Sequence, residues 1–181
     1  VSPVMIALAR QKAAADGLGV PFVVSDLANL RTSTVYDAVL CLGNSLPHLL
    51  TQDDLVAALR GMAGALRTGG ALVLQNLNYD LRWQGQPRWF MAQGGALDGQ
   101  EVLVWRFADY DAPAGRIAFH IALVRKDAPN WKVEVHTTPH RPLFRADLLA
   151  ALTDAGFSEP CTYGRMAQPH EAFDVSSSGD L

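Results

Sequence analysis

Apolar and polar positions along the first 80 residues follow the pattern of helices packed on a parallel sheet. In residues 3–15, Val4, Leu8 and Ala15 fall near one helical face, and Pro3 suits a first helical turn. Residues 20–26, 36–44 and 71–79 are short apolar runs, which is typical of strands buried on both faces. The order helix, strand, strand, helix, strand predicts crossover connections and a parallel sheet.

The helix before the third apolar run carries the clearest signals. Thr51 can cap it, and two acidic residues follow in its positively polarised first turn. We expect the helix to end at Gly69 and Gly70. Its apolar face is formed by Leu55, Leu59, Met62 and Leu66.

The pattern changes after residue 80. Residues 81–100 read as a loop rich in Trp, Gln and Gly, and three later segments alternate with a period near two, which predicts an antiparallel meander. A helix over 144–157 and a short strand at 161–163 follow. We therefore predict one α/β domain, residues 1–181, with a Rossmann-like, mostly parallel sheet that is incomplete at its N-terminus. Its parts are a cofactor-binding region 1–80, an antiparallel insertion 81–142 that covers the ligand edge as a lid, and a C-terminal helix and strand 143–181.

Composition narrows the class of protein. Of the 181 residues, 49% are hydrophobic and 18% charged, which argues against a disordered chain. The net charge of −3, without a basic stripe, argues against nucleic acid as a partner. There is no signal peptide and no apolar stretch near 18 residues, so we expect a cytoplasmic protein with no membrane partner.

From the spacing and positions of the Cys and His residues we expect no metal site. Cys41 and Cys161 match no metal or redox spacing. His120, His136 and His140 alternate with apolar residues or lie near turns, so we expect exposed strand positions rather than metal ligands.

Polar residues follow each of the three apolar runs. They lie at 25–27, 42–48 and 76–80, and in an open parallel sheet ligands bind beyond the carboxyl ends of the strands. We therefore expect these side chains to line one edge of the sheet. The alternatives from the residues alone stay open: Asp26 could cap the next turn, and Tyr79 could be a core aromatic.

Three sequence stretches in this order resemble one enzyme family. DAVLCLGNSLPHL at 37–49, LRTGG at 66–70 and ALVLQNLNYD at 71–80 resemble the class I S-adenosylmethionine-dependent methyltransferases. The nearest branch is that of the glycine and sarcosine N-methyltransferases, which carry a similar CLGNS-x-x-H stretch and a later NYD. SPVMIALAR at 2–10 resembles the helix after the second strand of that fold.

The resemblance implies S-adenosylmethionine as the cofactor and a role for each matching position. Asp26 would accept a hydrogen bond from the adenine amino group, and Asn44 and His48 would face the methyl donor and acceptor. His48 would also be suited to take a proton from the acceptor, and Tyr79 would act with it in catalysis. The substrate side would be Asn44, Asn78 and Tyr79, and the remaining cofactor contacts would come from Ser2, Met5, Leu27, Leu42 and Gly43.

The chain also departs from the family. It lacks the Gly-rich loop after the first strand and the acid expected before Val1, so we expect a fragment that is impaired in cofactor binding. Leu77 stands where glycine methyltransferases have an Arg that binds a carboxylate, which argues against glycine as the acceptor. Aromatic residues from the loop and meander could stabilise the cationic methyl group or simply form core: Trp83, Trp89, Phe90, Trp105 and Phe107.

The expected activity is methylation of a small molecule at nitrogen or oxygen. Two other classes stay open: a nucleotide-dependent oxidoreductase, and a non-catalytic truncated paralogue that serves as an interaction subunit. A homo-oligomer is also left open.

Overall fold

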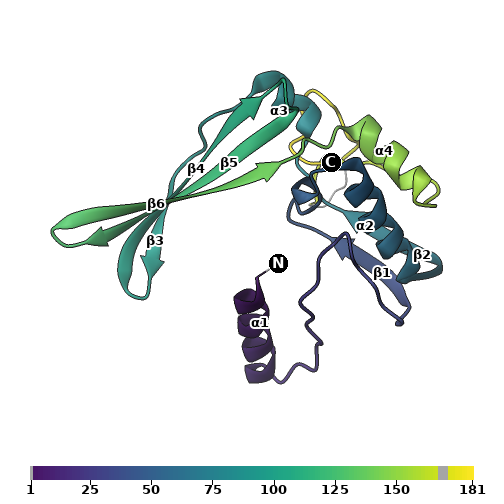
Figure 1. Cartoon of the computed structure of the whole chain (residues 1–181), viewed down its shortest axis with the longest axis horizontal. Helices are drawn as coiled ribbons and strands as arrows, with labels where there is room; N and C mark the ends of the chain where they lie inside the picture. The colour runs from purple at the N-terminus through teal and green to yellow at the C-terminus, as the bar shows by residue number, and fades with distance from the viewer. Residues whose placement is uncertain (1, 167–170) are drawn as a thin grey trace.

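The computed structural model describes residues 2–166 and 171–181 (Figure 1). In chain order the elements are α1 (Pro3–Ala15), β1 (Tyr36–Cys41), η1 (Leu46–His48), α2 (Gln52–Gly64), β2 (Leu66–Leu74), α3 (Tyr79–Gly85), β3 (Gln93–Leu97), β4 (Gln100–Asp111), β5 (Arg116–Asp127), β6 (Asn130–His140) and α4 (Arg145–Asp154). They form a parallel pair β1–β2 and a four-stranded antiparallel sheet in the order β3-β4-β5-β6.

The parallel pair is joined by the predicted crossover helix. β1 and β2 run in register from Ala38 beside Ala71 to Cys41 beside Leu74, and α2 connects them. The Thr51 side chain caps α2 by accepting a hydrogen bond from the backbone N–H of Asp54, as expected. Leu55, Leu59 and Met62 are buried, which confirms these three residues of the predicted apolar face. The fourth, Leu66, lies in β2 and not on the helix.

The end of α2 was predicted too late in the chain. The helix ends at Gly64, and the two glycines belong to β2. Gly69 has a φ of 76°, and a Cβ on Gly70 would lie 3.0 Å from the carbonyl oxygens of Arg67 and Asp37. Both glycines therefore allow the first part of β2 to bend and to lie close to β1. They do not form a helix C-cap.

The first predicted strand is absent. Residues 20–26 carry no strand, and the side chains of Val20, Val23 and Val24 are exposed. The segment is apolar, but no described strand lies beside it to pair with its backbone. The segment is tied to α1 instead, since the Arg10 guanidinium donates to the carbonyl of Phe22. Figure 1 shows α1 standing apart from the parallel pair.

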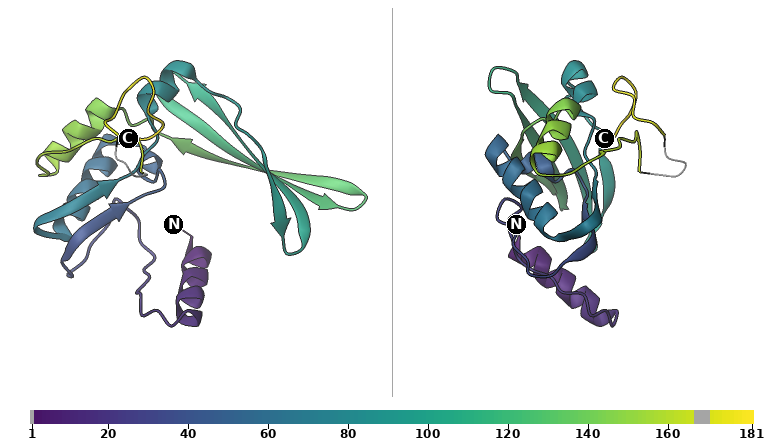
Figure 2. Two further views of the ribbon diagram at one scale, coloured as in Figure 1. Left: turned by 180° about the vertical axis from the view of Figure 1, so that it is seen from behind. Right: turned by 90° about the vertical axis from the view of Figure 1, so that its right-hand side faces the viewer.

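The antiparallel meander is confirmed and is larger than predicted. β3 lies in the stretch expected to be a loop, and the short helix α3 extends into it from Tyr79, where the third strand was expected to continue. Figures 1 and 2 show β4, β5 and β6 as one long twisted ribbon, with one end against the helices and the other projecting away. At the near end Ala108, Ile117 and Phe119 pack in the same core cluster as α2 and α4.

The C-terminal region returns to the end of β2. α4 packs on α2, and Leu181 exchanges two backbone hydrogen bonds of 2.9 Å with Asn76. The strand expected at 161–163 is reduced to a single bridge between Tyr163 and Ala172. The predicted fold class is confirmed as mixed α/β with a parallel and an antiparallel sheet. Within residues 2–166 and 171–181, no helix has the length and apolarity to cross a membrane.

Candidate functional site

The carboxyl ends of β1 and β2 meet in a tight turn built on Gly43 and Asn44. Both residues have positive φ angles, 74° and 57°, which turn the chain sharply at the end of the strand. The side-chain oxygen of Gln75, at the end of β2, accepts hydrogen bonds from the backbone N–H groups of Gly43 (2.8 Å) and Asn44 (3.2 Å). One side chain from the neighbouring strand therefore holds the turn in place.

The side chain of Asn44 ties this turn to the segment after β2. Its amide nitrogen donates to the Tyr79 hydroxyl at 2.9 Å, and its amide oxygen accepts from the backbone N–H of Leu77 at 3.1 Å. Tyr79 is only 2% exposed, and this burial raises the pKa of its hydroxyl. The predicted meeting of Asn44 and Tyr79 is therefore present, with a neutral tyrosine that orients the amide.

The backbone at this turn is open to a ligand. A Cβ placed on Gly43 would meet no atom within 4 Å, and Leu42 beside it is exposed. The Ser45 hydroxyl donates to the carbonyl of Leu42 at 2.8 Å, which fixes the turn from its other side. A preorganised, uncovered strand end of this kind is the place where ligands bind in open α/β sheets.

The base of the meander is bonded to the loop that follows the turn. Arg116 donates to the carbonyl of Leu50 at 2.6 Å, and the backbone N–H of Arg141 donates to the carbonyl of Pro47 at 2.8 Å. The Arg141 guanidinium also reaches the carbonyl of Thr51 (3.2 Å) and the side chain of Gln52 (2.6 Å). These bonds hold the near end of the ribbon beside η1.

His48 lies on η1 and meets a second histidine from β6. The ring of His140 lies edge-on to that of His48 with centroids 4.5 Å apart, and it also stacks on Phe119 with centroids 5.3 Å apart. The expectation that His140 is an exposed strand residue is wrong, because it is 7% exposed. Burial, with a smaller effect from His48, lowers the pKa of His140 to about 4.

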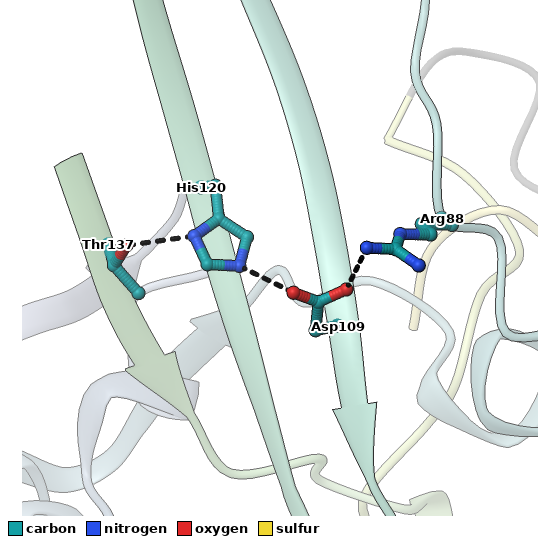
Figure 3. Close-up of polar contacts among 4 residues, drawn as sticks. All are labelled: Arg88, Asp109, His120 and Thr137. Carbon is teal, nitrogen blue, oxygen red and sulfur yellow. Dashed lines mark hydrogen bonds and ion pairs between the residues drawn. The ribbon is translucent and has the colours of Figure 1, made fainter. Parts of the chain in front are cut away.

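The other two meander histidines differ from each other. His136 is exposed, as expected. His120 is largely covered, against expectation. Its Nδ1 lies 2.8 Å from the Thr137 hydroxyl and its Nε2 3.2 Å from Asp109, which in turn pairs with Arg88 at 2.9 Å (Figure 3). Its ring stacks on Phe107 with centroids 4.5 Å apart.

The remaining cofactor candidates do not join the turn through any bond recorded in the described part of the chain. The Asp26 carboxylate caps its own turn, accepting from the N–H of Ala28 at 2.9 Å, and Leu27 packs against the core. Ser2 caps α1, and Met5 is exposed on that helix.

The side chain of Asn78 is occupied in holding the C-terminal segment. Its amide donates to the carbonyls of Val175 (3.0 Å) and Ser178 (2.9 Å), and its oxygen caps α3 by accepting from Leu81. Asn78 thus links the segment after β2 to the C-terminal segment and to α3. A hollow of about 480 Å³ lies on the opposite edge of β2, between this strand and α4, and Gln75 is the one residue named at the turn that borders it.

Sequence reasoning missed two residues of this site. Gln75 was passed over because a polar residue at a strand end has no motif of its own, although its position opposite Gly43 is a signal. His140 was missed because its burial depends on the meander base packing against η1, which no local pattern reveals.

Comparisons with known proteins find similarity to methyltransferases. A family model described as "Methyltransferase domain" matches residues 1–70. A glycine/sarcosine N-methyltransferase of Parasynechococcus marenigrum is 36% identical over 69 residues, which are 38% of this chain and 24% of that protein. The chain thus spans about a quarter of the length of this curated relative.

Solved structures match over much more of the chain. The CcbJ methyltransferase from Streptomyces caelestis has a TM-score of 0.79 and 22% identity, covering 99% of this chain and 74% of that one. S-adenosylmethionine-bound CalS10, an amino pentose methyltransferase from Micromonospora echinaspora, has a TM-score of 0.68 and 22% identity, covering 94% and 69%. Together these matches confirm the resemblance to the class I methyltransferases, and they support S-adenosylmethionine as the cofactor.

The buried His140 gives a prediction about stability and pH. Its pKa falls from 6.5 to about 4 on folding, so between these values the unfolded chain binds more protons and stability drops as the pH falls. In the whole protein, this histidine should cost about 2 kcal/mol of unfolding free energy between pH 7 and pH 5. His140→Phe keeps an aromatic ring but cannot titrate, so it should flatten this slope in urea unfolding. His136→Phe, on the same strand but exposed, is the control, and an unchanged slope in His140→Phe would contradict the prediction.

Proposed function

We propose, from the premise that this chain carries the fold of the class I S-adenosylmethionine-dependent methyltransferases, that the whole protein methylates a small molecule. The observation that carries the proposal is the Gly43–Asn44 turn, held open at the end of β1 by Gln75 and Tyr79. The cofactor, when bound, supplies an activated methyl group on a sulfonium. The protein then has to align the acceptor and exclude water.

Each residue near the turn has a part in this proposal. Gly43 and Leu42 would present open backbone to the sulfonium end of the cofactor, and Asn44 would face the transferring methyl group. Tyr79, being buried and bonded to Asn44, would act by orienting that amide, and Asn78 would hold the segment that carries Tyr79. His48 would accept the proton of a protonated acceptor, since a histidine can do so near neutral pH.

The adenine side of the site would be formed by Ser2, Met5, Asp26 and Leu27. Asp26 sits at the end of an exposed apolar segment, 20–26, whose valines a bound nucleoside could partly cover. The meander would close over the acceptor, because its base is bonded to the loop beside the turn.

For the acceptor we place nitrogen ahead of oxygen. The relative from Parasynechococcus marenigrum is named as an N-methyltransferase, and CalS10 as an amino pentose methyltransferase. Leu77, packed against the core, offers no cation for a carboxylate, which favours an acceptor other than glycine. We also propose a cytoplasmic location and self-association.

The experiment that tests the proposal compares ligands and turnover in the whole protein. Equilibrium binding of labelled S-adenosylmethionine should be saturable and should exceed that of NAD, which would exclude the oxidoreductase alternative. Label should then pass to an amine in a panel of amino sugars and other small amines without a carboxylate, and methylated glycines should stay unlabelled. Cofactor binding without transfer to any acceptor would favour the non-catalytic interaction subunit, and no binding would refute the proposal.

Asp26 provides a test with an internal control for folding. In the whole protein, Asp26→Ala should weaken S-adenosylmethionine binding by about 1–3 kcal/mol, the cost of leaving a buried donor unpaired. Asp26→Asn should weaken it similarly, because its one oxygen would stay with the N–H of Ala28 while its amide would face the adenine amino group. The Asn variant should keep the wild-type unfolding midpoint. Unchanged affinity in both variants, measured by calorimetry, would remove Asp26 from the site.

The 181-residue chain on its own should bind the cofactor poorly. The class I methyltransferases that this chain resembles hold the amino-acid end of the cofactor with a Gly-rich loop. None of residues 1–181 matches that loop. Calorimetry on this chain should show binding at least tenfold weaker than on the whole protein, since lost polar contacts of this kind are worth about 1.4 kcal/mol or more. Equal affinity would show that residues 1–181 hold the cofactor unaided.

A further inference from the structure

The C-terminal segment, residues 174–181, is bonded across the end of β2. The backbone of Asp180 pairs with that of Leu77 in an antiparallel bridge. Next to it, the backbone N–H of Asn78 donates to the carbonyl of Gly179 at 3.0 Å. Backbone contacts therefore hold Asp180 in place independently of its own carboxylate.

The Asp180 carboxylate accepts a hydrogen bond from the side chain of Gln75. Its Oδ1 lies 2.9 Å from Gln75 Nε2, in part-buried surroundings. The other end of the same amide, Oε1, accepts from the backbone N–H groups of Gly43 and Asn44. The Gln75 amide therefore connects the C-terminal segment to the turn at the end of β1.

The neighbours of the Gln75 amide require it to have one orientation. A carboxylate can only accept hydrogen bonds, and a backbone N–H can only donate them. If the amide were turned over, its NH₂ group would face the two N–H groups of the turn, and its oxygen would face the Asp180 carboxylate. Three hydrogen bonds would then be replaced by contacts between like partners. Asp180 and the turn thus specify the same orientation of Gln75 from opposite sides.

The same bonds complete a closed network around the ends of the two parallel strands. From the turn it runs through Gln75 and Asp180 into the C-terminal segment, which the Asn78 side chain also holds. Tyr79 follows Asn78 in the chain and returns to the turn through its bond with Asn44. A network in which the side chains brace one another keeps a ligand site in a single arrangement.

We propose that Asp180 is a positioning residue of the methyl-donor site, which acts by holding the Gln75 amide in the orientation that fixes the Gly43–Asn44 turn. This role rests on the proposed function, because the cofactor has to bind at the turn for the geometry of the turn to affect methyl transfer. The C-terminal segment thereby becomes part of the structure that shapes the cofactor site, although Asp180 itself acts only through Gln75.

Hydrogen exchange of single amides, in the whole protein without ligand, tests the link to the turn. Asp180→Ala should speed exchange of the Gly43 and Asn44 N–H groups about three- to tenfold, the factor that corresponds to one net hydrogen bond. Asp180→Asn should stay within about twofold of wild type, because its side-chain oxygen can still accept from Gln75. Unchanged exchange in Asp180→Ala would overturn the proposal.

Asp174 supplies the matched control on the same segment. Its carboxylate accepts from the backbone N–H and the hydroxyl of Ser176, within its own turn, at 2.7 and 2.6 Å. Asp174→Ala should therefore leave exchange at the Gly43–Asn44 turn at the wild-type rate. Equal acceleration by Asp174→Ala and Asp180→Ala would overturn the specific role of the Asp180 carboxylate.

An exchange of donor and acceptor tests the direct contact. Gln75→Glu alone would set two carboxylates against each other where a 2.9 Å hydrogen bond now lies, so it should speed exchange of the turn at least as much as Asp180→Ala does. Adding Asp180→Asn supplies an amide N–H that donates to the new carboxylate. The double variant should then return to within about threefold of the wild-type rate. A double variant that exchanges as fast as Gln75→Glu would refute the pairing.

Cofactor affinity shows whether the link serves the methyl-donor site. In calorimetry on the whole protein, Asp180→Ala should bind S-adenosylmethionine about three- to tenfold more weakly than wild type, and Asp180→Asn within about twofold. Gln75→Ala should also weaken binding, and adding Asp180→Ala to it should change nothing further, since the two residues act as one unit.

The outcomes separate this inference from the proposed function. If the wild type does not bind S-adenosylmethionine, the proposed function fails and the cofactor role of Asp180 fails with it, whereas the exchange result stands. If the wild type binds, normal affinity in Asp180→Ala with a loosened turn would overturn the role of Asp180 alone. Additive effects of Asp180→Ala and Gln75→Ala would likewise overturn its action through Gln75.

Discussion

The bridge formed by the Asn44 side chain is the interaction on which the proposed site depends. Two parallel strands end side by side, and without a cross-link the segments beyond them would be free to diverge. Asn44 reaches from the turn after β1 to the Leu77 N–H and the Tyr79 hydroxyl after β2. Each of these bonds is worth about 1 kcal/mol, and both partners are at least half-buried. The φ of 57° at Asn44 is tolerated because this geometry also aims its amide across the strand ends.

The second constraint is the attachment of the meander to the same region. Arg116 and Arg141 donate to backbone carbonyls of the loop after the turn, and His140 meets His48. An insertion bonded in this way cannot move far from η1 at its base, although its far end projects away from the helices (Figure 2). Acceptor selection would then come from the near end of the ribbon.

The sequence predicted what local chemistry determines. The cap at Thr51, the apolar face of α2, the two paired parallel strands and the alternation of the meander all depend on neighbouring residues, and all are observed. The link between Asn44 and Tyr79 was predicted from the shared edge of parallel strands. The strand predicted at residues 20–26 is not observed. A strand needs a neighbouring strand to pair with, and the valine pattern alone does not show whether one is present. The burial of His140 and the role of Gln75 depend on contacts between elements distant in the sequence. The positions of Ser2, Met5, Asp26 and Leu27 around a cofactor stay predictions.

Hydrogen exchange in the whole protein tests the central claim most directly. Addition of S-adenosylmethionine should slow amide exchange in peptides covering 42–48 and 75–80, because the ligand would cover the turn and stabilise the bridged strand ends. The far end of the ribbon, around 126–131, should be unaffected and serves as the internal reference. Saturating ligand, verified by calorimetry, that leaves both strand-end peptides unprotected would contradict the placement of the methyl-donor site at Asn44.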